Sequence, residues 1–315
     1  MSGLYIGSTA GYSGKNLMAV SLGLLLQQDG LNIGYMKPVG AMPRPGGGDE
    51  DADFVQSVLG LEQSDKLVTP VVVDQDFLDD AFNGKAGNQL DSIGDAYAKL
   101  VKDKDLCLVG GSGSLLHSGK YCGLDGVSVL RKLGIKTVVV DRYDNGHNYD
   151  YLLAIKELLG DDLAGAILND VPESEFAEVK SKLCPFLESK GVNVLGVIPS
   201  DNFIRGIRVG ELAKRLGGII ISAEQKTDAI VENALIGTMQ VENFMNHFQR
   251  QQHSAIIVGG DRSDIQLVAL EGSCPCILLT GNLYPNGMIV ARSEDLGIPI
   301  IVVKDDTFTV AKRFG

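Results

Sequence analysis

Short apolar runs rich in β-branched residues alternate with helical patterns along the whole chain, and this alternation constrains the fold more than any other feature. A strand that is apolar along its whole length is buried on both faces, which is typical of parallel sheets covered by helices. The first 200 residues therefore predict an α/β fold, a parallel sheet with helices on both faces. The expected strands are Leu4–Ser8, Asn32–Lys37, Leu106–Gly110, Thr137–Asp141, Gly165–Asn169 and Val192–Ile198, and the expected helices are Asn16–Gln28, Asp51–Leu59, Leu90–Val101, Asn148–Leu159 and Glu173–Ser189.

The alternation restarts after residue 201 and predicts a second, smaller α/β domain. A short helix with a glycine stop, Val209–Gly217, leads into it. Its expected strands are Gly218–Ser222, Ala234–Met239, Ala255–Gly259, Cys276–Thr280 and Pro299–Val303, and its expected helices are Val241–Gln251, Ser263–Leu270 and Gly287–Leu296. The 315 residues fit about two domains of ~150 residues each, and we expect them at 1–205 and 206–315.

Charge and cysteine content exclude several classes of function. Lys and Arg number 28 against 40 Asp and Glu, a formal net charge of −12, which argues against broad binding of nucleic acid or of an anionic membrane. The longest apolar stretch, Leu17–Leu26, is far shorter than the ~20 residues that a membrane-spanning helix needs. Five cysteines without paired metal-ligand spacing indicate reduced thiols. We therefore expect a cytoplasmic protein.

The loop between the first strand and the first helix carries the strongest chemical signal. A glycine-rich loop in this position presents backbone N–H groups to phosphates, the helix N-terminus adds a favourable dipole, and Lys15 reaches the terminal phosphates. Two positions depart from the usual G-x-x-x-x-G-K-[ST] pattern: Thr9 replaces the first glycine and Asn16 replaces the hydroxyl residue that binds Mg²⁺. The alternative is a glycine-rich turn with an incidental lysine. The candidate nucleotide-binding residues are Gly11, Ser13, Gly14, Lys15 and Asn16.

Charged residues also follow the second strand. Lys37 precedes a proline that ends the strand, so it is expected at the carboxyl edge of the sheet, where it can neutralise a transferring phosphoryl group; the alternative is a surface lysine. The acidic run Asp49–Asp53 opens a helix, where carboxylates favour the helix dipole. One of them, with Asp51 the best candidate, can also bind Mg²⁺ beside the phosphates.

Three strand ends of the second domain carry polar turns that a parallel sheet would gather at one edge. Their candidate ligand or interface residues are Asp261, Arg262, Thr280 and Asp306. Ordinary turn and capping chemistry is the alternative explanation, because Gly, Asp, Asn and Ser dominate turns.

Short motifs follow one another in a fixed order along both parts of the chain. In the first 200 residues they are Gly14-Lys15, Lys37-Pro38-Val39, Asp51-Ala52, Leu108-Val109 with Gly111 and Gly113, Leu168-Asn169 and Leu195–Pro199, and in the second part they are Ile257–Ile265, Leu279–Gly281 and Asp306-Thr307. The first series resembles the dethiobiotin-synthetase-like P-loop group, which includes the ATP-binding domain of cobyrinic acid a,c-diamide synthases. The second part resembles the DRTGG domain, and the pairing is similar to the N-terminal region of long bacterial phosphotransacetylases.

This resemblance implies roles for individual residues. Lys15 would bind phosphates, Lys37 would contact the phosphoryl group and the substrate, Asp51 would bind Mg²⁺, and Asn169 would recognise adenine. Catalytic members of the group usually have Ser or Thr where Asn16 stands and Glu where Gly110 stands, and both departures weaken metal coordination.

Three functions follow as hypotheses. The first is a regulatory or sensing protein that binds ATP or another nucleotide, with or without Mg²⁺, and hydrolyses it weakly or not at all. The second is an ATP-dependent enzyme that phosphorylates a carboxylate or carbamate, with Lys15 and Lys37 as its catalytic residues. The third is a degenerate P-loop domain kept for assembly. We expect a homo-oligomer, a small-molecule or protein partner at the DRTGG-like domain, and Mg²⁺-dependent turnover that rises when Asn16 becomes Thr and Gly110 becomes Glu.

Overall fold

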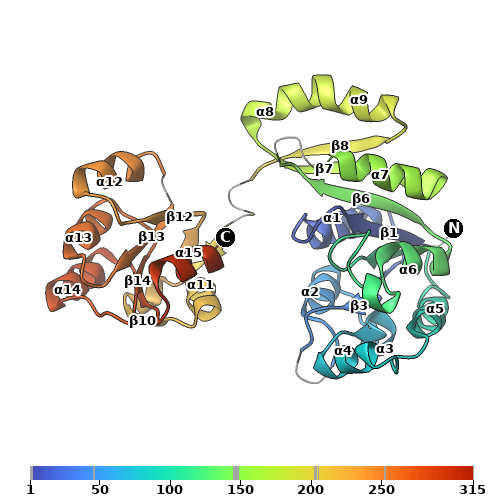
Figure 1. Ribbon diagram of the computed structural model, residues 1–315, viewed down its shortest axis with the longest axis horizontal. Coiled ribbons are helices and arrows are strands. Elements are labelled where there is room, and N and C mark those ends of the chain that lie inside the picture. The colour runs from blue at the N-terminus through green and yellow to red at the C-terminus, as the bar shows by residue number, and fades with distance from the viewer. Residues whose placement is uncertain are drawn as a thin grey trace. The chain divides into compact units, whose positions relative to one another are not determined.

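The computed structural model describes residues 3–44, 47–144, 149–201, 204, 206–251 and 253–314, and it divides into two compact units, Met1–Ser200 and Asp201–Gly315. Each unit is an α/β layer structure with its own sheet (Figure 1). The expected helix start at Asn148 and the expected boundary residue Arg205 lie outside the described residues. No described helix is long and apolar enough to cross a membrane.

The first unit is built on a six-stranded sheet in the order β2-β5-β1-β6-β7-β8, in which every neighbouring pair is parallel. The P-loop-type α/β fold expected from the sequence is confirmed, since β1 lies in the interior of the sheet with helices flanking it (Figure 1). The strands are β1 (Gly3–Ser8), β2 (Ile33–Met36), β5 (Leu106–Gly110), β6 (Lys136–Arg142), β7 (Leu163–Val171) and β8 (Val194–Pro199). A separate two-stranded sheet pairs β3 (Val39–Gly40) with β4 (Val71–Val72).

The helices of the first unit pack around this sheet and one continuous apolar core. They are α1 (Lys15–Gln28), α2 (Glu50–Leu59), α3 (Asp65–Val68), α4 (Gln75–Phe82), α5 (Gln89–Leu100), α6 (Gly126–Leu133), α7 (Tyr149–Leu159), α8 (Glu173–Glu178) and α9 (Cys184–Ser189), with 3₁₀ turns η1 (Lys120–Cys122) and η2 (Gly160–Asp162). The single helix expected over Glu173–Ser189 is interrupted by a π-helical segment, η3 (Val179–Leu183). Pro185 explains the interruption, because proline lacks an N–H and clashes with the carbonyl one turn earlier.

The second unit has a five-stranded sheet in the order β10-β15-β14-β13-β12, with apolar clusters on both faces. Four strands run parallel, and the edge strand β10 is antiparallel to β15. The strands are β10 (Ile219–Ser222), β12 (Asn233–Ile236), β13 (Ser254–Gly259), β14 (Ile277–Thr280) and β15 (Ile300–Val302), and β9 (Ile207–Arg208) pairs with β11 (Ile230–Val231). The helices are α11 (Val209–Leu216), α12 (Val241–Phe248), α13 (Ser263–Glu271), α14 (Gly287–Leu296) and α15 (Thr307–Phe314), with a 3₁₀ turn η4 (Glu224–Lys226).

Candidate functional site

The β1–α1 loop (residues 9–14) leaves the carboxyl end of an interior strand and enters α1 directly. Its backbone has positive φ at Tyr12 (55°) and Gly14 (95°). Successive residues of right- and left-handed conformation turn their N–H groups toward a common point, which forms a concave anion-binding site. Glycine is required at position 14 for two reasons: its φ is left-handed, and a Cβ there would clash with the amide of Asn169.

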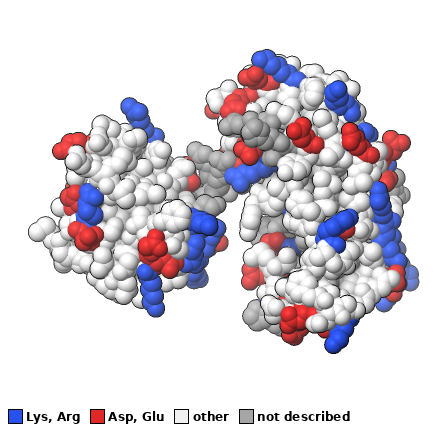
Figure 2. Space-filling model, in the orientation of Figure 1, with Lys and Arg blue, Asp and Glu red and all other residues white. Residues whose placement is uncertain are grey.

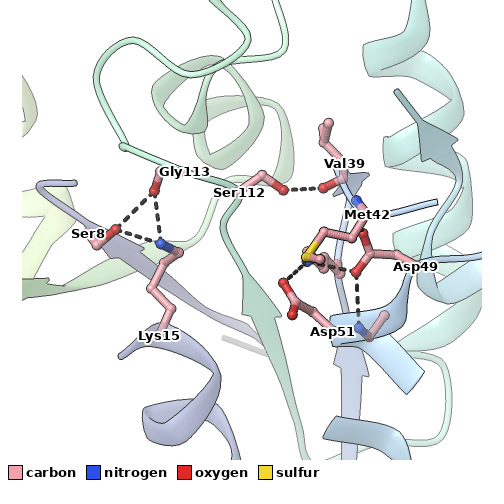
Figure 3. Close-up of polar contacts among 10 residues, drawn as sticks. Ser8, Lys15, Val39, Met42, Asp49, Asp51, Ser112 and Gly113 are labelled. Atoms are coloured by element: carbon pink, nitrogen blue, oxygen red, sulfur yellow. Dashed lines mark hydrogen bonds and ion pairs between the residues drawn. The ribbon is translucent and has the colours of Figure 1, made fainter. Parts of the chain in front are cut away.

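Lys15 is the first residue of α1 and lies at the mouth of the β1–α1 loop. Its Nζ donates to Ser8 Oγ at 2.8 Å and to the carbonyl oxygen of Gly113 at 2.9 Å, on the chain that follows β5 (Figure 3). Burial and the positive charge of Lys37 lower its pKa to about 8, although Asp51 acts in the opposite direction. A half-buried cation whose partners are neutral oxygens is poised to exchange them for a phosphate.

Lys37 directly follows β2, which pairs with β5 on the side opposite β1, and its charge is neutralised there by the two aspartates labelled in Figure 3. It is 3% exposed, and its Nζ lies 2.7 Å from Asp49 Oδ1 and 2.5 Å from Asp51 Oδ2. Asp49 is fully buried and also accepts hydrogen bonds from the backbone N–H groups of Met42 and Ala52, the latter as the N-cap of α2. Lys37 therefore holds two carboxylates in place and brings no unbalanced positive charge to the site.

Asn16 and Asp51, the two candidate magnesium ligands, are in contact. Burial alone would raise the pKa of Asp51, but a hydrogen bond and the charge of Lys37, a hydrogen bond from Asn16 and the charge of Lys15 together lower it, so this carboxylate is ionised. Among the described residues there is no cluster of three or more His, Cys, Asp or Glu side chains placed to hold a metal ion. The pair fits Mg²⁺ only where phosphate oxygens supply the other ligands.

Gly110, where the resemblance leads one to expect a glutamate, has no room for a side chain. A Cβ built on it would lie 2.5 Å from the hydroxyl oxygen of Tyr35, on the neighbouring strand β2. The Tyr35 side chain is fully buried, and its hydroxyl finds no hydrogen-bond partner in the described part of the chain. Burial and the charges of Asp51 and Asp49 raise its pKa. The packing between β2 and β5 therefore favours glycine at position 110 over a residue with a carboxylate.

Two further residues tie the β1–α1 loop to neighbouring strands. Asn169 on β7 donates from Nδ2 to the carbonyl oxygen of Ser13 at 3.0 Å. Asp141 on β6 accepts a hydrogen bond of 2.6 Å from the hydroxyl of Thr9, the residue that stands in place of the first glycine. Burial raises the pKa of Asp141 to about 6; the Thr9 bond opposes that rise and the charge of Asp144 adds to it.

A cavity of about 180 Å³ opens beside these groups. Its lining includes Val39, Gly110, Gly113 and Tyr121. Ser112 closes one side by donating to the carbonyl oxygen of Val39 (Figure 3). The outer wall is lightly built, because the Tyr121 ring packs against the exposed ring of Phe82 at the end of α4, a helix with no buried residue. The cavity borders Pro38 and Val39, the two residues that follow Lys37 in the chain.

The polar turns of the second unit gather at the carboxyl ends of β13, β14 and β15, but three of the four residues singled out have a structural partner nearby. Arg262 makes a bidentate ion pair with Asp264 at 2.9 Å for both bonds. The hydroxyl of Thr280 bonds that of Thr307 at 2.8 Å. Asp306 accepts from two backbone N–H groups and one hydroxyl at the start of α15. A ligand at Asp261 and its neighbours stays a prediction. Figure 2 shows acidic and basic side chains interspersed over the visible face of each unit.

Sequence reasoning missed three residues of the site. The sequence indicates Asp49 only as one of the carboxylates that favour the helix dipole, but its side chain is the N-cap of α2 and accepts from the N–H of Ala52. An aspartate directly before a helix is a typical N-cap and could have been identified as one. Asp141 ends an apolar strand, which places it at the same sheet edge as the β1–α1 loop. Tyr35 carried no signal, because its role depends on the pairing of β2 with β5.

Comparison with known proteins identifies both parts of the chain. A family model described as an AAA domain matches residues 2–206, and a model described as a DRTGG domain matches residues 211–314. The phosphate acetyltransferase of Nitratidesulfovibrio vulgaris is 26% identical over 324 residues, covering 97% of this chain and 46% of that protein. The ATP-dependent dethiobiotin synthetase BioD of Methanococcus vannielii is 26% identical over 190 residues, covering 59% of this chain and 87% of that protein.

Among solved structures, the CBS and DRTGG domains of the regulatory region of Clostridium perfringens pyrophosphatase, complexed with diadenosine tetraphosphate, match with a TM-score of 0.29 and 17% identity, covering 48% of this chain and 72% of that one. The chain spans less than half the length of the phosphate acetyltransferases that it matches.

Proposed function

This chain belongs to the AAA domain family over residues 2–206 and continues as a DRTGG domain, and on that basis we propose that it is a nucleotide-binding regulatory protein that hydrolyses its nucleotide weakly or not at all. The nucleotide is ATP, held at the β1–α1 loop. The DRTGG domain transmits to a partner whether nucleotide is bound, as a regulatory region does. Similarity to the N-terminal part of phosphate acetyltransferases along 97% of the chain supports this arrangement.

The observation that carries the proposal is the β1–α1 loop itself. Positive φ at Tyr12 and Gly14 directs backbone N–H groups inward, α1 presents its N-terminus to the same space, and Lys15 lies beside it with its two hydrogen bonds made to neutral oxygens. These groups together fit a polyphosphate, whose charge would also restore the lowered pKa of Lys15 toward its ordinary value.

Asn169 supports adenine as the base. Its amide nitrogen donates one of its two hydrogens to the carbonyl oxygen of Ser13, which fixes the amide, and its oxygen is a hydrogen-bond acceptor that can face the base. The 6-amino group of adenine is a donor and matches it. Guanine carries a carbonyl oxygen at the same position, and two acceptors would face each other.

Weak turnover follows from the charges around the terminal phosphate. Phosphoryl transfer depends on positioning and on neutralising the charge of the transferred group. Lys37 is already paired with two carboxylates, and position 110 cannot hold a third metal ligand beside Asn16 and Asp51. We expect hydrolysis well below the ~1 s⁻¹ that marks the low end of typical enzymes.

One observation favours the alternative, an ATP-dependent enzyme that phosphorylates a carboxylate or carbamate. The cavity of about 180 Å³ lies beside Gly110 and Gly113, where a second substrate would reach the terminal phosphate. Similarity to dethiobiotin synthetases over the first unit supports the same function.

Thermal unfolding with ATP, with and without Mg²⁺, tests the proposal. A ligand that binds only the native state stabilises it by about 2.7 kcal/mol at a concentration of 100 Kd, or roughly 5–10 °C for a unit of this size. We expect the shift for the unmodified protein and for Lys102→Ala, an exposed control lysine, and its loss in Lys15→Ala. Guanine nucleotides should give a smaller shift.

Mg²⁺ and product analysis separate the functions. A shift with ATP that is indifferent to Mg²⁺, with little phosphate released, supports sensing. A shift that requires Mg²⁺, with robust phosphate release, supports the enzyme. The absence of any shift, or an equal shift in Lys15→Ala, contradicts nucleotide binding at this loop.

A further inference from the structure

Tyr12 is the most exposed large apolar side chain that the structure describes, at 95%, and it lies at the tip of the β1–α1 loop. It also has a left-handed backbone, with φ of 55°. That conformation costs a side chain with a Cβ about 1–2 kcal/mol, whereas glycine adopts it freely and asparagine adopts it readily. The loop therefore contains a strained residue whose ring contributes no buried surface in the nucleotide-free chain.

The left-handed backbone at position 12 is imposed by the hydrogen bonds around it. The hydroxyls of Ser8 and Ser13 both donate to the carbonyl oxygen of Ala10, at 2.6 and 3.0 Å. The carbonyl of Ser13 is in turn bonded to Asn169. These bonds form the concave site for an anion, and none of them involves the ring of Tyr12. The concave site explains the conformation of position 12, and the presence of an aromatic side chain there needs a separate reason.

Besides Tyr12, the loop exposes apolar surface only at Ala10, a single methyl group that is too small to extend the ring into a docking patch. Gly11 has no side chain, and the hydroxyl of Ser13 is turned inward to Ala10. The ring stands one and two residues from the N–H groups of Ser13 and Gly14, so the group nearest to it would be whatever the loop binds. Tyrosine has only two side-chain torsions, and fixing them over a ligand costs little entropy.

We propose that the ring of Tyr12 closes over the nucleotide held by the β1–α1 loop and is a contact residue for a nucleoside triphosphate. This rests on the proposed nucleotide binding. The ring shields the phosphate tail from water and strengthens the hydrogen bonds beneath it, and its hydroxyl can donate to a phosphate oxygen. The strain at position 12 is compatible with such a role, because strained residues cluster at ligand-binding loops.

The chain contains no tryptophan, so Tyr12→Trp places a single indole at the loop tip. We expect ATP to shift its emission to shorter wavelength and to lower its acrylamide quenching constant at least about twofold. Phe186→Trp is the matched control, since Phe186 is half-exposed on α9, which leads into the start of β8 at the opposite sheet edge. The control should respond to neither ATP nor ADP.

Unchanged quenching in a Tyr12→Trp protein that still shows the ATP-induced thermal shift would overturn the inference and leave nucleotide binding intact. Loss of the shift in the unmodified protein would instead remove the proposed function. Quenching protection that appears without nucleotide as the protein concentration rises would also overturn it, because a second copy would then cover the ring.

A second pair of variants separates the ring from the backbone. Tyr12→Asn keeps a residue that tolerates positive φ and removes the ring, so it should melt at or above the temperature of the unmodified protein and yet bind ATP about tenfold more weakly. Tyr12→Phe should retain most of the affinity if the ring carries the contact. A Tyr12→Asn protein with unchanged affinity would contradict the proposal, and a purely structural role would not combine equal or greater stability with weaker binding.

Discussion

Replacing Gly110 by alanine tests the packing that keeps position 110 empty. Gly110 does not have positive φ, so alanine meets no backbone strain there. The added Cβ would lie 2.5 Å from the hydroxyl oxygen of Tyr35 and 3.3 Å from the ring carbon that carries it. Overpacking of this kind costs about 1–3 kcal/mol, and the reduced freedom of the unfolded chain returns about 0.4–1 kcal/mol. We expect Gly110→Ala to destabilise the protein by about 1–2 kcal/mol.

Tyr35→Phe should remove the conflict. It deletes a buried hydroxyl without a partner among the described residues, which by itself should stabilise the protein by an amount on the order of 1 kcal/mol. The contact left behind is 3.3 Å, which a small shift of the ring relieves. In the Tyr35→Phe background, Gly110→Ala should therefore cost close to nothing, a coupling energy of about 1–2 kcal/mol.

Urea denaturation of the four proteins measures this coupling, provided that the slope of free energy against urea concentration stays constant. An equal cost of Gly110→Ala in both backgrounds would refute the reasoning, and so would a Tyr35→Phe protein less stable than the unmodified one. The result also decides how catalysis can be tested. A glutamate at position 110, combined with Asn16→Thr, needs a smaller residue at position 35 before Mg²⁺-dependent turnover can rise.

Three further predictions follow from the site. Asp49→Ala should cost about 3–5 kcal/mol by urea denaturation, because it removes an N-cap and leaves Lys37 buried with one partner; a cost below 1 kcal/mol would contradict the buried pair. Asp141 has a raised folded pKa of about 6, so its ionisation destabilises the fold above pH 6 and its protonation relieves that cost as the pH falls. Asp141→Asn should therefore raise the free energy of unfolding by about 1–3 kcal/mol at pH 8 and by progressively less from pH 6 to 4. A gain in stability that is independent of pH would count against this reasoning. Gly14→Ala should displace Asn169 and weaken ATP binding at least about tenfold by calorimetry, and unchanged affinity would argue against the concave loop.

Periodicity predicted the elements that are long and buried. The six strands of the first sheet read as apolar runs because both of their faces are covered. The short helices α3, α4, α6 and α15 escaped prediction, since four to eight residues hold few turns; α11 is equally short, but the glycine that ends it indicated a helix. The antiparallel direction of β10 was also beyond the pattern, because side-chain alternation is the same for a strand running either way.

The same distinction between local and long-range contacts holds for the site. The β1–α1 loop is local in sequence, and its glycines and lysine predicted its place and its exit from β1 into a helix. The burial of Lys37 between two carboxylates was not foreseen, since it depends on how the chain folds back after β3. Tyr35 and Gly110 lie on strands that are 70 residues apart in the sequence and become neighbours only when the sheet forms. No local sequence signal therefore indicates their contact.

The light construction of α4 bears on how molecules enter the cavity. The chain that leads into α4 contributes Val73 to the cavity wall, and one ring contact, Phe82 on Tyr121, links its far end to that wall. An aromatic contact of this kind contributes about 0.5–1.5 kcal/mol, and α4 adds the partial burial of Phe77 against the core; together these are a small fraction of the free energy that holds the whole unit together. Detachment of α4 is therefore a local opening, much more frequent than global unfolding. The equilibrium between attached and detached α4 therefore sets the width of the cavity entrance, which can open for a larger ligand while the sheet stays in place.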